Sequence, residues 1–199
     1  MSNHYYSNRP DVESNPSVIQ HTGRGQKFTL ETDRGVFSKS GVDFGSRVLM
    51  EAFQAPQIEG NFADVGCGYG PIGITLAKSF PDRVVHLVDV NERAVELAQK
   101  NADRNGVQNV RIDVSDGMEK VPTELAAVIT NPPIRAGKET IFRFYVEAHE
   151  RLASGGELWV VIQKKQGAPS TKDFLEQHFN EVEVAEKVKG YWILKAKKY

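Results

Sequence analysis

The segment DVGCGYGPIG, residues 64–73, is the most informative stretch of this sequence. From Gly68 onward it matches G-x-G-x-x-G, the fingerprint of dinucleotide-binding folds. It also reads as Asp64 followed by glycine at alternate positions 66, 68 and 70. Glycine lacks a side chain and accepts positive φ, so backbone here can approach a ligand closely. The segment therefore predicts a ligand-binding turn, and the residues around it decide which ligand.

Short apolar runs alternate with amphipathic stretches on either side of this turn. The runs that predict strands are residues 61–65, 84–90, 110–114, 125–130 and 157–163, and the stretches that predict helices are 71–80, 91–106, 138–156 and 170–179. Apolar runs without in–out alternation are typical of parallel strands that are buried on both faces. We expect a Rossmann-like α/β fold with its ligand beyond the carboxyl ends of the strands.

Both ends of the chain depart from this alternation. Residues 181–189 and 191–197 predict a terminal hairpin around Gly190, which adds at least one antiparallel strand to the sheet. Near the other end, residues 26–37 predict a small hairpin with its turn at 33–35, and residues 43–53 predict a helix. We expect an irregular arm over 1–20 and a single domain over 21–199, with a hairpin and helix extension over 21–56.

Composition narrows the class of protein. The chain has 199 residues, a formal net charge of −1 and one cysteine, so no intramolecular disulfide can form. It shows no signal peptide and no apolar run near the roughly 20 residues that span a bilayer. A cytoplasmic protein without a membrane partner is expected. The near-neutral total does not exclude a nucleic acid, because local basic patches matter more.

Three acidic residues follow predicted strands and separate the possible ligands. Asp64 ends the first strand, where an acidic group suits a cationic ligand such as an amino-acid ammonium. Asp89 ends the second, about 20 residues after the turn, where a carboxylate binds ribose hydroxyls. This fits NAD and S-adenosylmethionine equally. Asp116 follows the third strand, where it either accepts a hydrogen bond from an adenine amino group or caps a helix.

The segment TNPPI, residues 130–134, ends the fourth predicted strand. Proline fixes φ and has no N–H, so this segment is stiff and its carbonyls are free. The side-chain oxygen of Asn131 and the carbonyl of Pro132 then form two acceptors that suit an –NH2 group. A nicotinamide oxidoreductase leaves both this motif and Asp64 without a role.

The motifs DVGCGYG, VDVN, SDG and NPPI, in this order, resemble those of class I S-adenosylmethionine-dependent methyltransferases, in the N-methylating branch that carries Asn-Pro-Pro. The segments at 35–53 and 153–170 resemble the small-subunit (16S) ribosomal RNA guanine-N2 methyltransferase family more closely. The resemblance implies a seven-stranded sheet, S-adenosylmethionine as cofactor and no metal. It also implies ribosomal RNA or the small ribosomal subunit as partner, and a monomer or homodimer.

The same resemblance implies roles for individual residues. Around the cofactor they are Asp64, Gly66, Gly68 and Gly70 at the methionine portion, Asp89 at the ribose and Asp116 at the adenine, and Asn131 also belongs to the cofactor-binding set. The catalytic motif is Asn131, Pro132 and Pro133, and the substrate contacts are Ile134, Arg135, Lys138, Lys164 and Lys165. Ile134 departs from the family pattern, which has an aromatic residue there to stack on a flipped base.

Other functions share parts of this pattern. Asn-Pro-Pro also serves adenine-N6 and protein-glutamine methyltransferases, in which an aromatic residue is expected where this chain has Ile134. A non-catalytic RNA-binding module on the same fold and an NAD-dependent oxidoreductase are more distant alternatives. Label transfer to RNA or to protein separates these classes.

Overall fold

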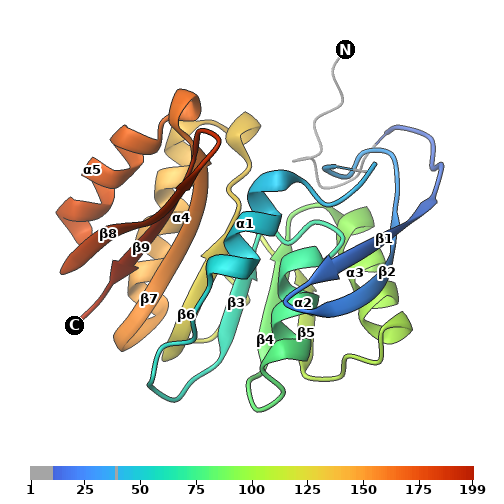
Figure 1. Ribbon diagram of the computed structural model, residues 1–199, viewed down its shortest axis with the longest axis horizontal. Helices are drawn as coiled ribbons and strands as arrows, with labels where there is room; N and C mark the ends of the chain where they lie inside the picture. Colours follow the sequence, from blue (N-terminus) through green and yellow to red (C-terminus); the bar gives the residue numbers. More distant parts are fainter. Residues whose placement is uncertain (1–10, 39) are drawn as a thin grey trace.

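The computed structural model describes residues 11–38 and 40–199, within which seven strands form one sheet (Figure 1). In sheet order the strands are β5 (Val110–Val114), β4 (Val85–Asp89), β3 (Phe62–Val65), β6 (Leu125–Thr130), β7 (Leu152–Gln163), β9 (Tyr191–Lys197) and β8 (Glu181–Val188). β9 runs antiparallel to both of its neighbours, whereas the strands from β5 to β7 are parallel. This confirms the Rossmann-like α/β fold and its C-terminal hairpin.

Helices cover both faces of the sheet (Figure 1). One hydrophobic cluster packs α1 (Phe44–Ala52), α2 (Pro71–Ser79) and α3 (Glu92–Arg104) on the first face. A second cluster packs α4 (Lys138–Arg151) and α5 (Ala168–His178) on the other. Two short 3₁₀ helices, η1 (Ile134–Ala136) and η2 (Lys164–Gln166), follow the ends of β6 and β7. In the described part of the chain, no helix is long and apolar enough to cross a membrane.

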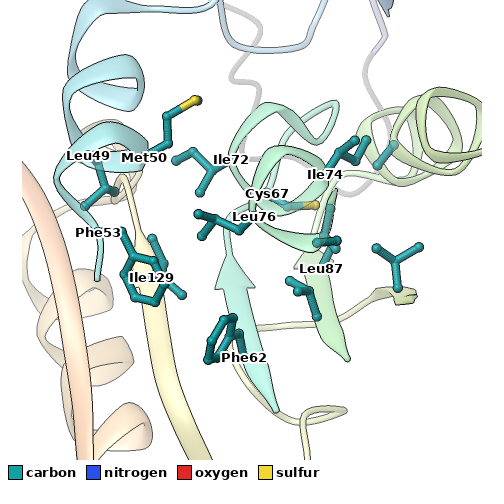
Figure 2. Packing of buried hydrophobic residues seen from close by; sticks show 14 of the residues in the cluster. Leu49, Met50, Phe53, Phe62, Cys67, Ile72, Ile74, Leu76, Leu87 and Ile129 are labelled. Atoms are coloured by element: carbon teal, nitrogen blue, oxygen red, sulfur yellow. The ribbon is translucent and has the colours of Figure 1, made fainter. Parts of the chain in front are cut away.

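Aromatic packing fixes α1 to the sheet. The Phe53 ring just after α1 meets Phe62 of β3 and Trp159 of β7 edge-on, with centroid distances of 5.4 and 5.3 Å. Figure 2 shows Phe53 and Leu49 on the side of the sheet that also carries Ile129 of β6 and Phe62 of β3, in the same hydrophobic cluster. Because these side chains are almost fully buried, α1 is held in one position. Its N-terminus can therefore orient residues at the carboxyl ends of the strands.

The N-terminal hairpin lies earlier in the chain than predicted. β1 (Ser17–Gly23) pairs with β2 (Gln26–Thr32), and the turn is Arg24-Gly25, both with positive φ as a tight hairpin turn requires. Residues 17–20 of the expected irregular arm are therefore strand, whereas residues 1–10 lie outside the described part. Asp33, Arg34 and Gly35 do form a turn, closed by a hydrogen bond from the Val36 N–H to the Asp33 carbonyl at 3.4 Å, but it follows β2 and joins no second strand. The Asp33 carboxylate accepts hydrogen bonds from Ser14 Oγ and the Asn15 N–H, both at 2.6 Å. The domain division at residue 20 stays a prediction.

α4 is shorter than predicted and β7 is longer. The helix ends at Arg151 instead of continuing to Gly156, and β7 begins at Leu152. Leu152 pairs with Leu125 of β6, and a register shift follows before the regular ladder resumes at Ala127. The strand therefore starts five residues early because its irregular first part still pairs with β6.

Candidate active site

A cavity of about 460 Å³ opens beyond the carboxyl ends of β3, β4, β6 and β7. This is where β3 separates β4 from β6, the switch point at which open α/β sheets bind ligands. Its walls include residues 66–69 of the glycine turn, residues 89–91 after β4, residues 131–135 after β6, and Gln163 with Tyr191 from β7 and β9. The cavity thus joins the glycine turn to the Asn-Pro-Pro motif.

The glycine turn adopts a conformation that favours glycine. Gly66 and Gly68 line the cavity with φ of 72° and 57°, and a Cβ on Gly68 would meet no atom within 4 Å. Both the Gly66 and Cys67 N–H groups donate to the Val88 carbonyl, at 2.9 and 3.0 Å, which fixes the turn to β4. Gly70 also has positive φ but packs against Ile74 instead of lining the cavity. The turn therefore leaves an open backbone cradle of the kind that cofactors occupy.

Asp64 lies buried beneath this turn instead of lining the cavity. Its Oδ2 accepts a hydrogen bond from the Gly73 N–H at 2.9 Å, whereas Oδ1 is buried without a partner among the described residues. Burial, together with the negative charge of Asp89 nearby, raises the pKa of Asp64 to about 7. A buried acceptor without a partner is costly, so a cationic donor that reaches Oδ1 directly or through water would be favoured.

Asp89 lines the cavity at the end of β4. Its Oδ2 accepts from the Gly68 N–H and its Oδ1 from the Asn91 N–H, both at 2.9 Å. These bonds fix the carboxylate and leave further lone pairs for a ligand's hydroxyls. Burial raises the pKa of Asp89 to about 6. The geometry suits the ribose contact implied for this residue.

Asp116 forms an ion pair at the surface instead of lining the cavity. Its Oδ1 accepts from Arg143 Nη2 at 2.7 Å, and its side chain is 52% exposed. The neighbouring Ser115 and Gly117 line the cavity, but Asp116 does not. An adenine contact needs this carboxylate to turn away from Arg143, so that role stays a prediction.

Asn131 lines the cavity in a fixed orientation. Its Nδ2 donates to Asp43 Oδ2 at 3.1 Å and to Ser46 Oγ at 3.0 Å. With both amide hydrogens engaged, the Oδ1 atom remains as an acceptor for a ligand. Asp43 also caps the N-terminus of α1 by accepting from the Ser46 N–H. Sequence reasoning missed this anchoring pair, whose one signal is an Asp before a helix with Ser three residues on.

The predicted substrate contacts divide into two groups. Ile134 and Arg135 line the cavity together with Pro132 and Pro133. The lysines at 138, 164 and 165 are exposed on the surface near the ends of β6 and β7, but they do not line the cavity. Phe37 also lines the cavity and is 45% exposed. Among the described residues, no group of three or more His, Cys, Asp or Glu side chains could hold a metal ion.

The strand order, the glycine cradle beneath Asp89 and the Asn-Pro-Pro segment define a class I S-adenosylmethionine-dependent methyltransferase. The chain belongs to the methyltransferase small domain family, whose model matches residues 27–195. Its cofactor is S-adenosylmethionine. The open cradle, the unpaired oxygen of Asp64 and the anchored Asp89 carboxylate fit that group.

Relatives and solved structures agree with this family. The chain is 53% identical over 200 residues to the uncharacterized protein YbxB of Bacillus subtilis, with full coverage of both. It is 31% identical over 178 residues to ribosomal RNA small subunit methyltransferase C of Acinetobacter baumannii, covering 86% of this chain and 52% of that protein. The chain thus spans about half the length of the methyltransferase C relatives.

A structure of the T. thermophilus 16S rRNA N2 guanine methyltransferase RsmC, in complex with AdoMet and guanosine, superposes with a TM-score of 0.83. It is 26% identical, covering 96% of this chain and 52% of that chain. M. jannaschii TYW2 superposes with a TM-score of 0.63 at 18% identity, which is a likeness of fold alone.

Proposed function

We propose that this protein is a cytoplasmic N-methyltransferase that modifies the exocyclic amine of a guanine in small-subunit ribosomal RNA. The observation that carries the proposal is the orientation of Asn131, whose amide nitrogen is held by Asp43 and Ser46 so that its oxygen is left as an acceptor. The methyltransferase C relatives and the RsmC structure with guanosine support guanine as the base and ribosomal RNA as the substrate.

An exocyclic guanine amine is a weak nucleophile because its lone pair is delocalised into the ring. Asn131 Oδ1 and the Pro132 carbonyl accept hydrogen bonds from the two amine protons, which localises the lone pair and orients it for reaction. S-adenosylmethionine supplies the electrophilic methyl group when bound. The proton that the nitrogen sheds after methylation goes to water. Cys67 takes no part as a nucleophile, because burial raises the pKa of its thiol well above the usual value.

The target base must leave any duplex to enter this cavity. Arg135 at the cavity wall and the exposed lysines at 138, 164 and 165 lie around the strand ends, where they can bind the phosphates of the displaced strand. The exposed Phe37 ring and Ile134 provide apolar surface for the base. In this proposal Phe37 supplies the aromatic contact that Ile134 does not.

Transfer of labelled methyl from S-adenosylmethionine tests the proposal. The acceptors are ribosomal RNA, small subunits that lack the modification, and total protein, each with wild-type enzyme and with Asn131→Ala. We expect label in RNA or in small subunits with wild-type enzyme and none with the variant. Label in protein would assign a different substrate class, and label that survives in Asn131→Ala would remove Asn131 from the mechanism.

A further inference from the structure

Gln163 and Tyr191 form a wall of the cavity that neither the cofactor nor the amine contacts explain. Gln163 ends β7 and Tyr191 begins β9, and the antiparallel register places the two residues directly opposite each other. The C-terminal hairpin places β9 beside β7, and this pairing brings both residues to the cavity.

The two side chains orient each other. Gln163 Nε2 donates a hydrogen bond to the Tyr191 hydroxyl oxygen at 2.6 Å. This leaves Gln163 Oε1 as an acceptor and the Tyr191 hydroxyl proton as a donor. Within residues 11–38 and 40–199, neither of these two groups has another hydrogen-bond partner. The wall thus presents one acceptor beside one donor.

This pair lies next to the anchor of Asn131. The Tyr191 ring packs edge-on against Phe44, with centroids 5.5 Å apart. It also covers Gly45 so closely that a Cβ there would lie 2.8 Å from the ring. Gly45 stands between Phe44 and Ser46, and Ser46 binds the Asn131 amide. The N-terminus of α1 thus links Asn131 to Tyr191 and Gln163 around one end of the cavity.

We propose that Gln163 and Tyr191 read the Watson–Crick edge of the target guanine. Along that edge guanine presents its N2 amine, then the N1–H donor, then the O6 acceptor. Asn131 Oδ1 and the Pro132 carbonyl take the amine, Gln163 Oε1 accepts from N1–H, and the Tyr191 hydroxyl donates to O6. The inference rests on the proposed function and extends it from the reacting amine to recognition of the base.

Adenine presents the reverse pattern at this wall. Its N1 is an acceptor and its N6 amine is a donor, so N1 would face Gln163 Oε1 and N6 would face the Tyr191 hydroxyl. While Gln163 Nε2 donates to the Tyr191 hydroxyl, two acceptors would meet at one position and two donors at the other. A site whose buried polar groups are left unpaired rejects a ligand strongly. The wall therefore selects guanine by hydrogen-bond polarity as well as by shape.

Two variants test this reading: Gln163→Leu removes the acceptor, and Tyr191→Phe removes the hydroxyl but keeps the ring over Gly45. We expect kcat/KM for methyl transfer to ribosomal RNA to fall about 5- to 150-fold in each. The affinity for S-adenosylmethionine, measured by equilibrium binding, should be unchanged. Gln177→Leu makes the same chemical change on the exposed side of α5 and should behave as wild type.

Nucleoside inhibition isolates the N1 and O6 contacts from the amine. Inosine has the N1–H and O6 of guanosine but no N2 amine, so we expect it to inhibit transfer by the wild-type enzyme more strongly than adenosine does. Both variants should lose that preference, which a purely structural role would not change. If the variants methylate guanine as fast as wild type while Asn131→Ala is inactive, the reading is wrong and the proposed function stands. If wild type yields no methylguanosine, both are wrong.

Discussion

Asn131 is oriented by two residues that precede it by 88 and 85 positions, Asp43 and Ser46. An unanchored asparagine amide can present either its NH2 or its oxygen to a ligand. Here the bonds from Nδ2 to two oxygens select the arrangement in which the oxygen is available. At the scale of single residues, the proposed mechanism therefore depends on Asp43 and Ser46, which line the same cavity and orient Asn131.

Ser46→Ala tests this orientation with little disturbance, because Asp43 can still cap α1 through the backbone N–H of residue 46. Loss of one hydrogen bond, about 0.5–1.5 kcal/mol, should lower kcat about 2- to 10-fold. The KM for S-adenosylmethionine should not change, as steady-state kinetics can determine. Ser170→Ala, an exposed serine on α5, is the matched control. An unchanged kcat in Ser46→Ala would show that Asp43 alone suffices.

The raised pKa values of Asp64 and Asp89 predict how the affinity for the cofactor depends on pH. Burial raises their pKa values to about 7 and about 6, so the folded, ligand-free protein holds protons that the unfolded chain releases near pH 4. The free energy of unfolding that each contributes therefore decreases as pH rises from about 4 to its folded pKa. A ligand that donates to both carboxylates favours the ionised forms.

We therefore expect S-adenosylmethionine to bind more tightly as pH rises from 5 to 7, and calorimetric titrations at several pH values measure this. The change is about tenfold in Kd for each pKa unit that binding removes. Asp64→Asn should flatten the profile, because it leaves only Asp89 to titrate. A Kd that is constant over this range would contradict the assignment of both carboxylates to the cofactor.

At the level of secondary structure, the close packing of α2 against β4 requires Gly73, the last glycine of the G-x-G-x-x-G match. Gly73 does not line the cavity. A Cβ at this position would lie 2.5 Å from Leu87 Cγ of β4, so the glycine permits close packing of helix and strand. Its N–H also binds Asp64. The match to a dinucleotide fingerprint thus reflects packing in a cradle that serves a different cofactor.

Gly73→Ala should lower the free energy of unfolding by about 1–3 kcal/mol, because Leu87 or α2 must shift to admit the methyl group. Urea unfolding gives this value directly. Gly41→Ala is the matched control, since φ there is not positive and no atom lies within 4 Å of the added Cβ. Equal stability of the two variants would mean that the contact between α2 and β4 relaxes without cost.

The two hairpins show what sequence patterns can and cannot locate. The C-terminal hairpin was predicted correctly, because Gly190 separates two clear β runs. The predicted position of the N-terminal hairpin is wrong, because the turn at Asp33-Arg34-Gly35 follows β2, whereas the turn that joins β1 to β2 is Arg24-Gly25. Side-chain contacts with distant residues engage Asp33, and local composition does not reveal them.

At the scale of the whole molecule, Asn101 of α3 joins three parts of the fold. Its Nδ2 donates to the Tyr69 carbonyl in the glycine turn at 2.8 Å and to the Glu31 carbonyl in β2 at 3.0 Å. Its Oδ1 accepts from the Glu31 N–H at 2.7 Å. The side chain is fully buried, so the N-terminal hairpin and the cofactor cradle are coupled through one residue.

Asn101→Ala should cost about 3 kcal/mol in the free energy of unfolding, because it leaves the buried Tyr69 carbonyl and the half-buried N–H and carbonyl of Glu31 unpaired. Hydrogen exchange should accelerate over residues 17–32 and 66–70, and the affinity for S-adenosylmethionine should fall. Asn180→Ala, at an exposed position after α5 where the side chain accepts from the Tyr199 N–H, should leave the hairpin, the cradle and the cofactor affinity unchanged. Faster exchange in the hairpin alone would argue against coupling to the cradle.

The architecture could be predicted because the central strands β3 and β6 are mostly apolar runs, helices separate most of the parallel strands along the chain, and each site motif is local in sequence. The residues that complete the site could not, since Asp43, Ser46 and Tyr191 reach it from α1 and β9. Conversely, the sequence predicts a cofactor contact for Asp116, whereas in the structure its carboxylate pairs with Arg143 of α4. Both outcomes depend on packing between elements distant in sequence.

In the proposed mechanism, Asn131 and Pro132 hold a guanine amine for methylation. The most direct test of this mechanism is mass spectrometry of nucleosides digested from small-subunit RNA after reaction with S-adenosylmethionine. We predict N2-methylguanosine with the wild-type enzyme and none with Asn131→Ala. Methyl groups on adenosine, or on a ring nitrogen of guanosine, would contradict the account.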